Sequence, residues 1–322
     1  MEYISFLLTM ATPVLPGGLW PVMLTPFRDD GSVDFDGLRR LTDFYLDAGS
    51  AGLFANCLSS EMFQLSPAER LGIADCVVQQ AAGRVPVVAC GNFGRDPVAV
   101  CAFIRQMADA GAAAVVLITG LLAGPEEEED RLRAAVEAIL EKTDPIPLGL
   151  YECPLPYKRL LSPGLMAALA GSGRFLYHKD TSSRQEDIRQ KLQAVAGTAL
   201  GFYNADTPTA LASLAGGAQG LSPIGANFYP ELYVALLNRF RQSVAGPEVR
   251  ELHAQLAVMD RLCHHIYPWS AKHFLKLRGL PIGTALRLPS ELPAEGDRLR
   301  LEALHDMLRM LARNLGIPLV LP

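Results

Sequence analysis

Lys179 and Tyr151 are the two residues whose types and positions in this sequence best suit catalysis. Lys179 stands at the end of the apolar run "FLYHK" and is followed at once by small hydroxyl residues. A buried lysine is costly unless it is paired or neutral, so an apolar strand end is an unusual place for one. Tyr151 ends another apolar run, in "LGLYECP". An amine beside a phenol suits imine chemistry, in which a neutral lysine attacks a ketone and a tyrosine transfers protons.

Each of these residues also has a purely structural alternative. Lys179 alone could extend from the tip of its strand into water, as most lysines do. Tyr151 alone could simply pack at the end of its strand. Imine chemistry is therefore favoured only if the fold brings both side chains to the same edge of a sheet.

Short apolar runs rich in Val, Leu or Ile recur along the chain up to residue 222. They are continuous rather than alternating, as in parallel strands that are covered on both faces. Segments with helical spacing separate them, as in "SPAERLGIADCVVQQAAG", where Ser66 and Glu69 form a capping box around Pro67 and Gly83 ends the helix. The expected strands are 18–24, 51–55, 85–90, 113–119, 146–151, 174–179, 198–203 and 219–222.

This repetition predicts an α/β protein with a (β/α)8 barrel over residues 17–230. We expect a loose N-terminal extension over residues 1–16, and the last barrel helix plus a C-terminal helical extension over residues 231–322. A doubly wound open sheet is disfavoured, because no Gly-rich phosphate loop follows the first strand. In a barrel, the carboxyl ends of the strands meet at one rim, where Tyr151 of the fifth strand and Lys179 of the sixth would be neighbours.

The composition argues against several classes of protein. Half of the 322 residues are hydrophobic and the formal net charge is −5, which disfavours nucleic acid as a partner. No apolar run approaches the ~20 residues of a membrane span, and the N-terminal segment lacks the basic start of a signal peptide. The six cysteines contain no C-x-x-C pair and no metal-ligand spacing. We therefore expect a cytoplasmic enzyme with reduced thiols.

The histidines give no sign of a metal site. His253, His264 and His265 fall in a late amphipathic helix, and we expect no carboxylate partner at ligand spacing, so structural or surface roles are favoured over zinc. His178 precedes the lysine, and strand alternation should turn its side chain away from the barrel axis. Because imine chemistry needs no metal, we expect neither a metal nor a cofactor.

Several segments together resemble the N-acetylneuraminate lyase and dihydrodipicolinate synthase family. They occur in the family's order and at similar spacing, from Gly17 to Pro230. The resemblance implies a (β/α)8 barrel, class I aldolase chemistry through a lysine Schiff base with pyruvate or another 2-oxo acid, and a homo-oligomer, either a dimer or a tetramer. The family's Schiff-base lysine falls on Lys179 and its tyrosine on Tyr151. The segments are "GLWPVMLTPF", "SSEMFQLSPAER", "LYECP", "HKDTSS" and "GAQGLSPIGANFYP".

The same resemblance implies a set of substrate-binding residues. The loop that binds the 2-oxo acid carboxylate falls on "CLSSE", residues 57–61. Backbone N–H groups at a loop that enters a helix favour an anion, and small hydroxyls add to them. The main-chain carbonyl of Ser222 is implied to face the bound ketoacid, and Glu61 is interpreted as a helix-start acid. The expected binding residues are Leu58, Ser59, Ser60 and Ser222, with Thr25 and Asn204 as rim candidates whose equal alternative is to cap a loop.

Three departures from the family pattern bear on the substrate. Leu58 stands where the first threonine of the loop relays protons, and Leu122 where a relay tyrosine commonly follows the fourth strand. Pro156 stands where dihydrodipicolinate synthases have an arginine that binds the second substrate's carboxylate. These departures argue against the lysine-biosynthesis reaction. Leu58 and Leu122, which stand in place of hydroxyls, also predict a more apolar pocket near Tyr151, suited to a hydrophobic or deoxy substrate.

Three functions remain open from the sequence. The first is a lyase that cleaves or joins a carbon–carbon bond through a pyruvate imine on Lys179. The second is a hydro-lyase that uses the same imine to expel water from a 3-deoxy or sugar-derived 2-oxo acid. The third is a barrel that binds a ketoacid without turnover. Retention of Lys179 and Tyr151 argues against the third, and loss of two relay hydroxyls argues for it.

Overall fold

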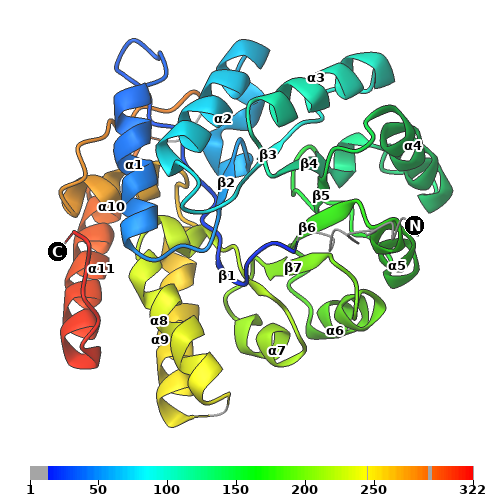
Figure 1. The fold of residues 1–322 in the computed structure, drawn as a ribbon. Helices are drawn as coiled ribbons and strands as arrows, with labels where there is room; N and C mark the ends of the chain where they lie inside the picture. Colours follow the sequence, from blue (N-terminus) through cyan, green and yellow to red (C-terminus); the bar gives the residue numbers. More distant parts are fainter. Residues whose placement is uncertain (1–13, 245, 289–291, 322) are drawn as a thin grey trace, which may run out of the picture.

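Eight parallel strands form a barrel at the centre of the molecule (Figure 1). The computed structural model describes residues 14–244, 246–288 and 292–321. Its strands are β1 Gly18–Leu19, β2 Leu53–Ala55, β3 Val87–Cys90, β4 Ala114–Ile118, β5 Leu148–Tyr151, β6 Phe175–Asp180, β7 Gly201–Asn204 and β8 Gly220–Leu221. They pair in the order β1-β8-β7-β6-β5-β4-β3-β2, and a parallel bridge between Val22 and Phe54 joins the two ends of this order. The (β/α)8 fold predicted from the sequence is confirmed.

The first strand is much shorter than expected. The run from 18 to 24 was expected to be one strand, but β1 ends at Leu19. Pro21 has no N–H group and cannot donate to a ladder, so only its carbonyl takes part, accepting from the Phe54 N–H at 3.0 Å. The sixth strand was expected to end at Lys179, but β6 runs one residue further, to Asp180.

A ring of helices covers the outside of the barrel (Figure 1). The predicted capping box of α2 is confirmed: the Ser66 hydroxyl accepts from the Glu69 N–H at 3.3 Å, and the Glu69 carboxylate accepts from the Ser66 N–H at 2.8 Å. Ala82 and Gly83, both with positive φ, follow its end. The ring consists of α1 Phe35–Asp47, α2 Pro67–Ala81, α3 Pro97–Asp109, α4 Glu129–Lys142, α5 Pro163–Gly171, α6 Gln185–Ala194, α7 Ala210–Ala215 and α8 Pro230–Gln242.

Three further helices pack on the flank of the barrel next to α1 and α8 (Figure 1). They are α9 Pro247–Cys263, α10 Trp269–Leu277 and α11 Glu295–Leu315. Arg278, which follows α10, places its guanidinium 5.0 Å from the ring centroid of Phe44 in α1 and forms an ion pair with Glu231 of α8. Within the described residues, no helix is both long and apolar enough to span a bilayer.

Aromatic side chains fill the interior of the barrel. The Tyr177 and Tyr203 rings stack with centroids 4.7 Å apart, and Trp20 lies 5.2 Å from the first and 5.1 Å from the second. The carbonyl of Pro16 accepts from the Trp20 indole at 3.1 Å and from the Tyr203 hydroxyl at 3.0 Å. The interior is therefore a packed core rather than a pore.

The start of the described chain closes one end of this core. The loose extension expected over residues 1–16 lies mostly outside the described residues, but Leu15 is buried against the barrel interior.

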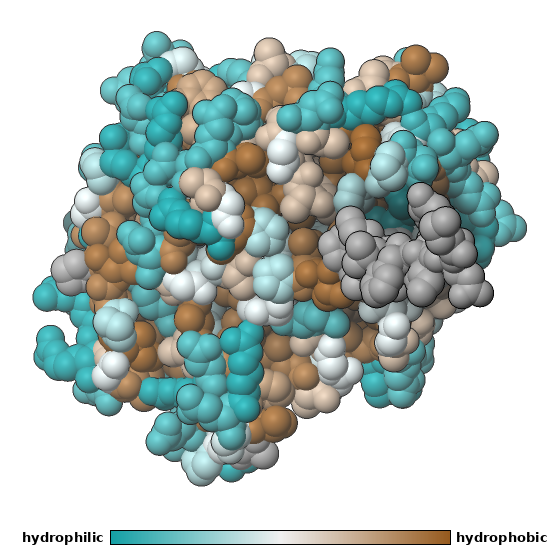
Figure 2. Space-filling model, in the orientation of Figure 1, coloured by the Kyte–Doolittle hydropathy of each residue, from teal (hydrophilic) through white to brown (hydrophobic). Residues whose placement is uncertain are grey.

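On the face that Figure 2 shows, hydrophobic residues lie scattered among hydrophilic ones over the outer helices, as on an ordinary protein surface.

A buried ion network holds the ends of β5 and β6 from the outside. The Lys191 ammonium of α6 donates to both carboxylate oxygens of Glu152, at 2.6 and 2.8 Å, and to Asp180 at 2.7 Å. His178 lies on the same outer side, 3.8 Å from the Asp180 carboxylate, as strand alternation predicted. Glu152 also accepts from the Leu161 N–H at 2.8 Å. Because Glu152 follows Tyr151 directly and Asp180 follows Lys179, the network fixes the backbone on which both catalytic candidates stand.

The acidic cluster in this network has a positively charged partner in the chain itself, Lys191. Ligand atoms of Glu152, His178 and Asp180 lie within 4.8 Å of one another, which is a spacing that a metal ion could use. However, the Lys191 ammonium already bridges the two carboxylates. Burial alone would lower the pKa of Lys191, but the two carboxylates raise it above its ordinary value. Lys191 therefore stays charged, and its ammonium occupies the position between the carboxylates that a metal ion could use.

We expect Lys191→Met to destabilise the fold by about 3–5 kcal/mol, because it leaves two buried carboxylates facing each other without a counter-charge. Urea unfolding monitored by circular dichroism measures this change. Arg189→Met is the matched control on the same helix: Arg189 pairs with Glu186 in water and should change the free energy of unfolding little. Equal midpoints for wild type and Lys191→Met would contradict the role given to the network.

Candidate active site

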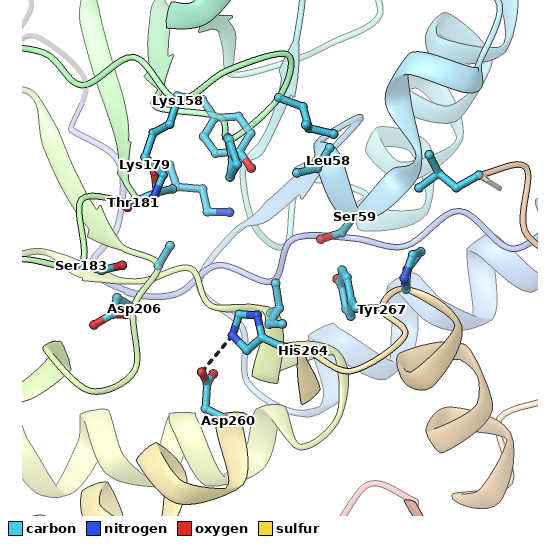
Figure 3. Close-up of a pocket in the computed structure, with 17 residues that line it drawn as sticks. Leu58, Ser59, Lys158, Lys179, Thr181, Ser183, Asp206, Asp260, His264 and Tyr267 are labelled. Carbon is cyan, nitrogen blue, oxygen red and sulfur yellow. Dashed lines mark hydrogen bonds and ion pairs between the residues drawn. The ribbon is translucent and has the colours of Figure 1, made fainter. Parts of the chain in front are cut away.

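Lys179 and Tyr151 lie side by side at the mouth of the barrel. They are register partners in the β5–β6 pair, and the Lys179 amine is 4.7 Å from the centroid of the Tyr151 ring. Both line a cavity of about 370 Å³ formed by the loops after β2, β5, β6, β7 and β8 and by the segment after α9. In Figure 3 the amine points into the open space of this cavity. The fold thus brings the amine and the phenol to one rim.

Lys179 differs from the other buried lysines. Three lysines are buried in the described part of the chain: Lys179, Lys191 and Lys272. Lys191 and Lys272 donate to buried carboxylates, whereas none of the described carboxylates forms an ion pair with Lys179. Burial lowers the pKa of Lys179 below its ordinary value. The pKa of Lys272 is also lowered by burial, although its carboxylate partner opposes the shift. The neutral amine that a nucleophile needs is therefore favoured at Lys179.

The surroundings of Tyr151 keep its hydroxyl protonated. The ring packs edge-on against Phe54 with centroids 5.5 Å apart, and burial raises the pKa of the phenol well above its ordinary value. The thiol of Cys153 neighbours the hydroxyl. Burial also raises the pKa values of Cys153 and Cys90, so these thiols place no negative charge beside the amine. Tyr151 thus begins as a proton donor rather than as a base.

The loop of residues 57–61 brings two of its three expected residues to the cavity. Leu58 and Ser59 line it, and the hydroxyl of Tyr267 interacts with Ser59 across the opening (Figure 3). Ser60 turns away: its hydroxyl donates to the Met23 carbonyl at 2.7 Å and accepts from the Cys57 N–H at 3.2 Å. Ser60 therefore shapes the loop instead of reaching the cavity.

Glu61 does not act as a helix-start acid, so that interpretation was wrong. It has a left-handed backbone, with φ 56°, and its side chain is buried. Its carboxylate accepts from the Lys272 ammonium at 2.8 Å and from the N–H groups of Arg287 at 2.6 Å and Leu288 at 2.8 Å. The loop is thereby tied to the C-terminal part of the chain, whose Leu288 lines the cavity. The sequence could not show this, because the partners lie more than two hundred residues away.

Three other candidates do not line the cavity with their side chains. The Ser222 hydroxyl donates to the Trp20 carbonyl at 2.8 Å, inside the barrel wall. Thr25 is fully buried, and its hydroxyl has no hydrogen-bond partner among the described residues. The Asn204 amide donates to Thr209 at 2.9 Å and to Ser213 at 3.0 Å, which is the loop-capping alternative.

The structure also changes the expected polarity of the pocket. Leu58 lines the cavity near Tyr151, as expected, but within this chain Leu122 lines a different cavity, of about 210 Å³, together with Asn92. The side of the cavity opposite Lys179 is polar (Figure 3). The expected preference for a hydrophobic substrate thus fits only the half of the cavity next to Tyr151. The polar side chains that line the cavity beyond the expected ones are Lys158, Thr181, Ser183, Asp206, Asp260, His264 and Tyr267.

Of the three late histidines expected in a helix without carboxylate partners, His253 lies in α9 and contacts the Thr207 carbonyl, but for His264 and His265, which follow α9, the expectation was wrong. His264 Nε2 lies 3.1 Å from Asp260, and His265 Nε2 lies 2.8 Å from Asp297. The first pair was visible in the sequence as an aspartate four residues before a histidine, one helical turn away. The second pair joins the segment after α9 to α11 and carries no local signal.

Comparisons with known proteins agree with this architecture. The curated relatives include 4-hydroxy-tetrahydrodipicolinate synthases from Methanothrix thermoacetophila, 30% identical over 84% of this chain and 86% of the relative, and from Gluconacetobacter diazotrophicus, 29% identical over 90% and 96%. Among solved structures, YagE, a prophage protein from E. coli K12 in complex with pyruvate, has a TM-score of 0.83 and 25% identity over 91% of this chain and 98% of its own. A dihydrodipicolinate synthase from Bacillus anthracis has a TM-score of 0.82 and 22% identity, over 91% and 99%.

A model of one family spans nearly all of the barrel and much of the C-terminal extension. It is described as the dihydrodipicolinate synthetase family, and it matches residues 15–307. The match includes the strands that carry Tyr151 and Lys179, the loop of residues 57–61, and α9. With this match and the 30% identity to a curated synthase, the chain belongs to the dihydrodipicolinate synthetase family, a family of barrel lyases.

Proposed function

We propose that this chain is a class I aldolase that forms a Schiff base between Lys179 and pyruvate or another 2-oxo acid. The observation that carries the proposal is the buried Lys179 amine, which has a lowered pKa and no described carboxylate partner, 4.7 Å from the Tyr151 ring. YagE, which shares this fold, is known in complex with pyruvate. The imine then serves as an electron sink for cleaving or forming a carbon–carbon bond.

The two residues take complementary parts in forming the imine. The neutral amine attacks the ketone carbon, and the resulting carbinolamine must lose its hydroxyl group as water. Because burial keeps the Tyr151 phenol protonated, Tyr151 can donate a proton to that leaving oxygen. The backbone N–H groups of Leu58 and Ser59, with the Ser59 hydroxyl, would hold the carboxylate of the 2-oxo acid, and the Ser222 carbonyl would face it.

The second substrate is proposed to differ from that of the curated relatives. Their printed name describes synthesis of 4-hydroxy-tetrahydrodipicolinate. In this chain Leu58 offers no hydroxyl to Tyr151, and Pro156 offers no guanidinium for a second carboxylate. Of the two alternatives, a hydro-lyase would use the same imine, whereas a ketoacid-binding barrel without turnover would not need Tyr151. We further propose that the protein acts in the cytoplasm and forms a homo-oligomer. Light scattering during size-exclusion chromatography would test the oligomeric state.

Pyruvate plus borohydride should leave a covalent adduct on Lys179, found by mass spectrometry in the peptide that carries "HKDTSS". Since burial lowers the pKa of Lys179, a larger fraction of its amine is neutral at a given pH than for an exposed lysine, and trapping should not require alkaline solution. Lys179→Arg should abolish trapping, because a guanidinium stays charged and is no nucleophile. Lys158→Arg, at a second lysine of the same cavity, should keep it. Absence of an adduct at saturating pyruvate would contradict the proposed function.

Tyr151→Phe should slow borohydride trapping by about 100- to 10,000-fold while leaving pyruvate affinity nearly intact. The ring still fills its place against Phe54, and only the proton donor is lost. Quenched time courses of borohydride trapping measure the rate, and calorimetry measures pyruvate affinity, so the two effects can be separated. Equal trapping rates in wild type and variant would mean that another group or water supplies the proton.

Pyruvate and aspartate semialdehyde should condense slowly or not at all on this chain. The reason is that Leu58 and Pro156 replace the hydroxyl and guanidinium that the resemblance assigns to this reaction. A coupled assay of the condensation product measures the rate. Turnover near the ~10 per second of a median enzyme would show that these two positions do not determine the substrate.

A further inference from the structure

His264 faces Lys179 from the opposite wall of the cavity (Figure 3). It directly follows α9, and its Nε2 lies 3.1 Å from a carboxylate oxygen of Asp260, one helical turn earlier. The His264 side chain is 54% exposed, whereas that of Asp260 is 11% exposed. The His264 imidazole therefore lies at the cavity mouth, in contact with the largely buried carboxylate of Asp260.

Asp260 is itself held in place by buried hydroxyls. Its other carboxylate oxygen accepts from the Thr207 hydroxyl at 2.8 Å, and that hydroxyl lies 2.8 Å from the hydroxyl of Tyr233 in α8. With both oxygens engaged, Asp260 has one orientation. An ionised carboxylate can only accept from the imidazole, so in neutral His264 this contact favours the tautomer with its proton on Nε2 and a lone pair on Nδ1.

The imine chemistry needs a base that the described groups around the amine do not supply. To become a nucleophile, a pyruvate imine must lose a proton from C3. Burial raises the pKa of Tyr151 well above its ordinary value, and it also raises the pKa values of the Cys90 and Cys153 thiols, so all three hold their protons in the resting site. For the same reason, the phenolate that Tyr151 becomes when it donates to the carbinolamine regains a proton from water and is not left as the base of the next step. Asp206 also lines the cavity, but one of its carboxylate oxygens is bonded to the Thr209 hydroxyl at 2.8 Å. An imidazole is a stronger base than an aspartate, with an ordinary pKa near ~6.5 against ~3.9.

We propose that His264, oriented by Asp260, is the base that removes the C3 proton from the imine of a 2-oxo acid. This inference rests on the proposed Schiff base at Lys179. The C3–H bond breaks and its proton moves to Nδ1 of His264, directly or through one water. The electron pair of that bond forms the C2–C3 double bond, and the π pair of the iminium returns to nitrogen, giving a neutral enamine. Asp260 stabilises the imidazolium that results and is a positioning residue.

Pyruvate alone is enough to test this step, because loss of the C3 proton exchanges the methyl hydrogens with solvent. The loss of the pyruvate methyl signal in D2O, followed by NMR, gives the exchange rate, and borohydride trapping on the same sample gives the rate of imine formation. His264→Gln should slow exchange by about 100-fold or more and leave trapping unchanged. Asp260→Asn should also slow exchange, since a carboxamide can donate to Nε2 and so favour a proton on Nδ1.

His265→Gln is the matched control, because the neighbouring histidine pairs with Asp297 at a different cavity and should exchange like wild type. Added imidazole should restore exchange to His264→Ala, since the site of His264 is open to solvent. Melting curves verify that each variant is folded.

The outcomes separate this inference from the proposed function. If wild type forms no adduct with borohydride, the Schiff base itself is wrong and the role of His264 falls with it. If wild type traps pyruvate but exchange in His264→Gln matches wild type, only the assignment of His264 is overturned. Loss of trapping together with exchange in His264→Gln, with no rescue of His264→Ala by imidazole, would assign His264 to binding and would also overturn its role as a base.

Discussion

The Lys179 amine lies where a charged ammonium is costly, and the rest of the site follows from that constraint. Burial lowers its pKa, and none of the described carboxylates forms an ion pair with it. The nearby Cys90 and Cys153 thiols have raised pKa values and so add no negative charge. A neutral amine is the nucleophile that a Schiff base requires, whereas an ion pair at the same place would keep it charged.

The fold keeps its buried charges on the other side of the same strands. Because side chains alternate across a strand, Lys179 faces the barrel mouth while Asp180 faces α6, and Tyr151 and Glu152 divide in the same way. Lys191 bridges the two outer carboxylates, so the ion pairs that fix the backbone lie on the opposite side of the strands from the amine. The ionic outer layer and the buried Lys179 amine, the proposed nucleophile, are therefore built from consecutive residues.

The C-terminal helices are part of the site rather than an addition to the barrel. Glu61 binds Lys272 of α10 and thereby fixes the loop whose Leu58 and Ser59 line the cavity. From the end of α9 come Asp260 and His264, which make the wall opposite Lys179 polar. The half of the cavity next to Tyr151 holds the amine and the phenol of the proposed imine chemistry. The opposite half is where the proposed enzyme would contact the rest of its substrate.

The sequence by itself determined the barrel, the α2 capping box and the neighbouring places of Tyr151 and Lys179, because apolar periodicity, capping residues and strand-end positions are local patterns. Only the tertiary structure decided the partners of Glu61, the hydrogen bond of the Asn204 amide to Thr209 in the loop that follows it, and the position of His264 in the cavity. Those outcomes depend on which side chains meet across the fold, often from segments far apart in the chain. Local patterns describe a residue's own element, and contacts between distant elements are set by packing.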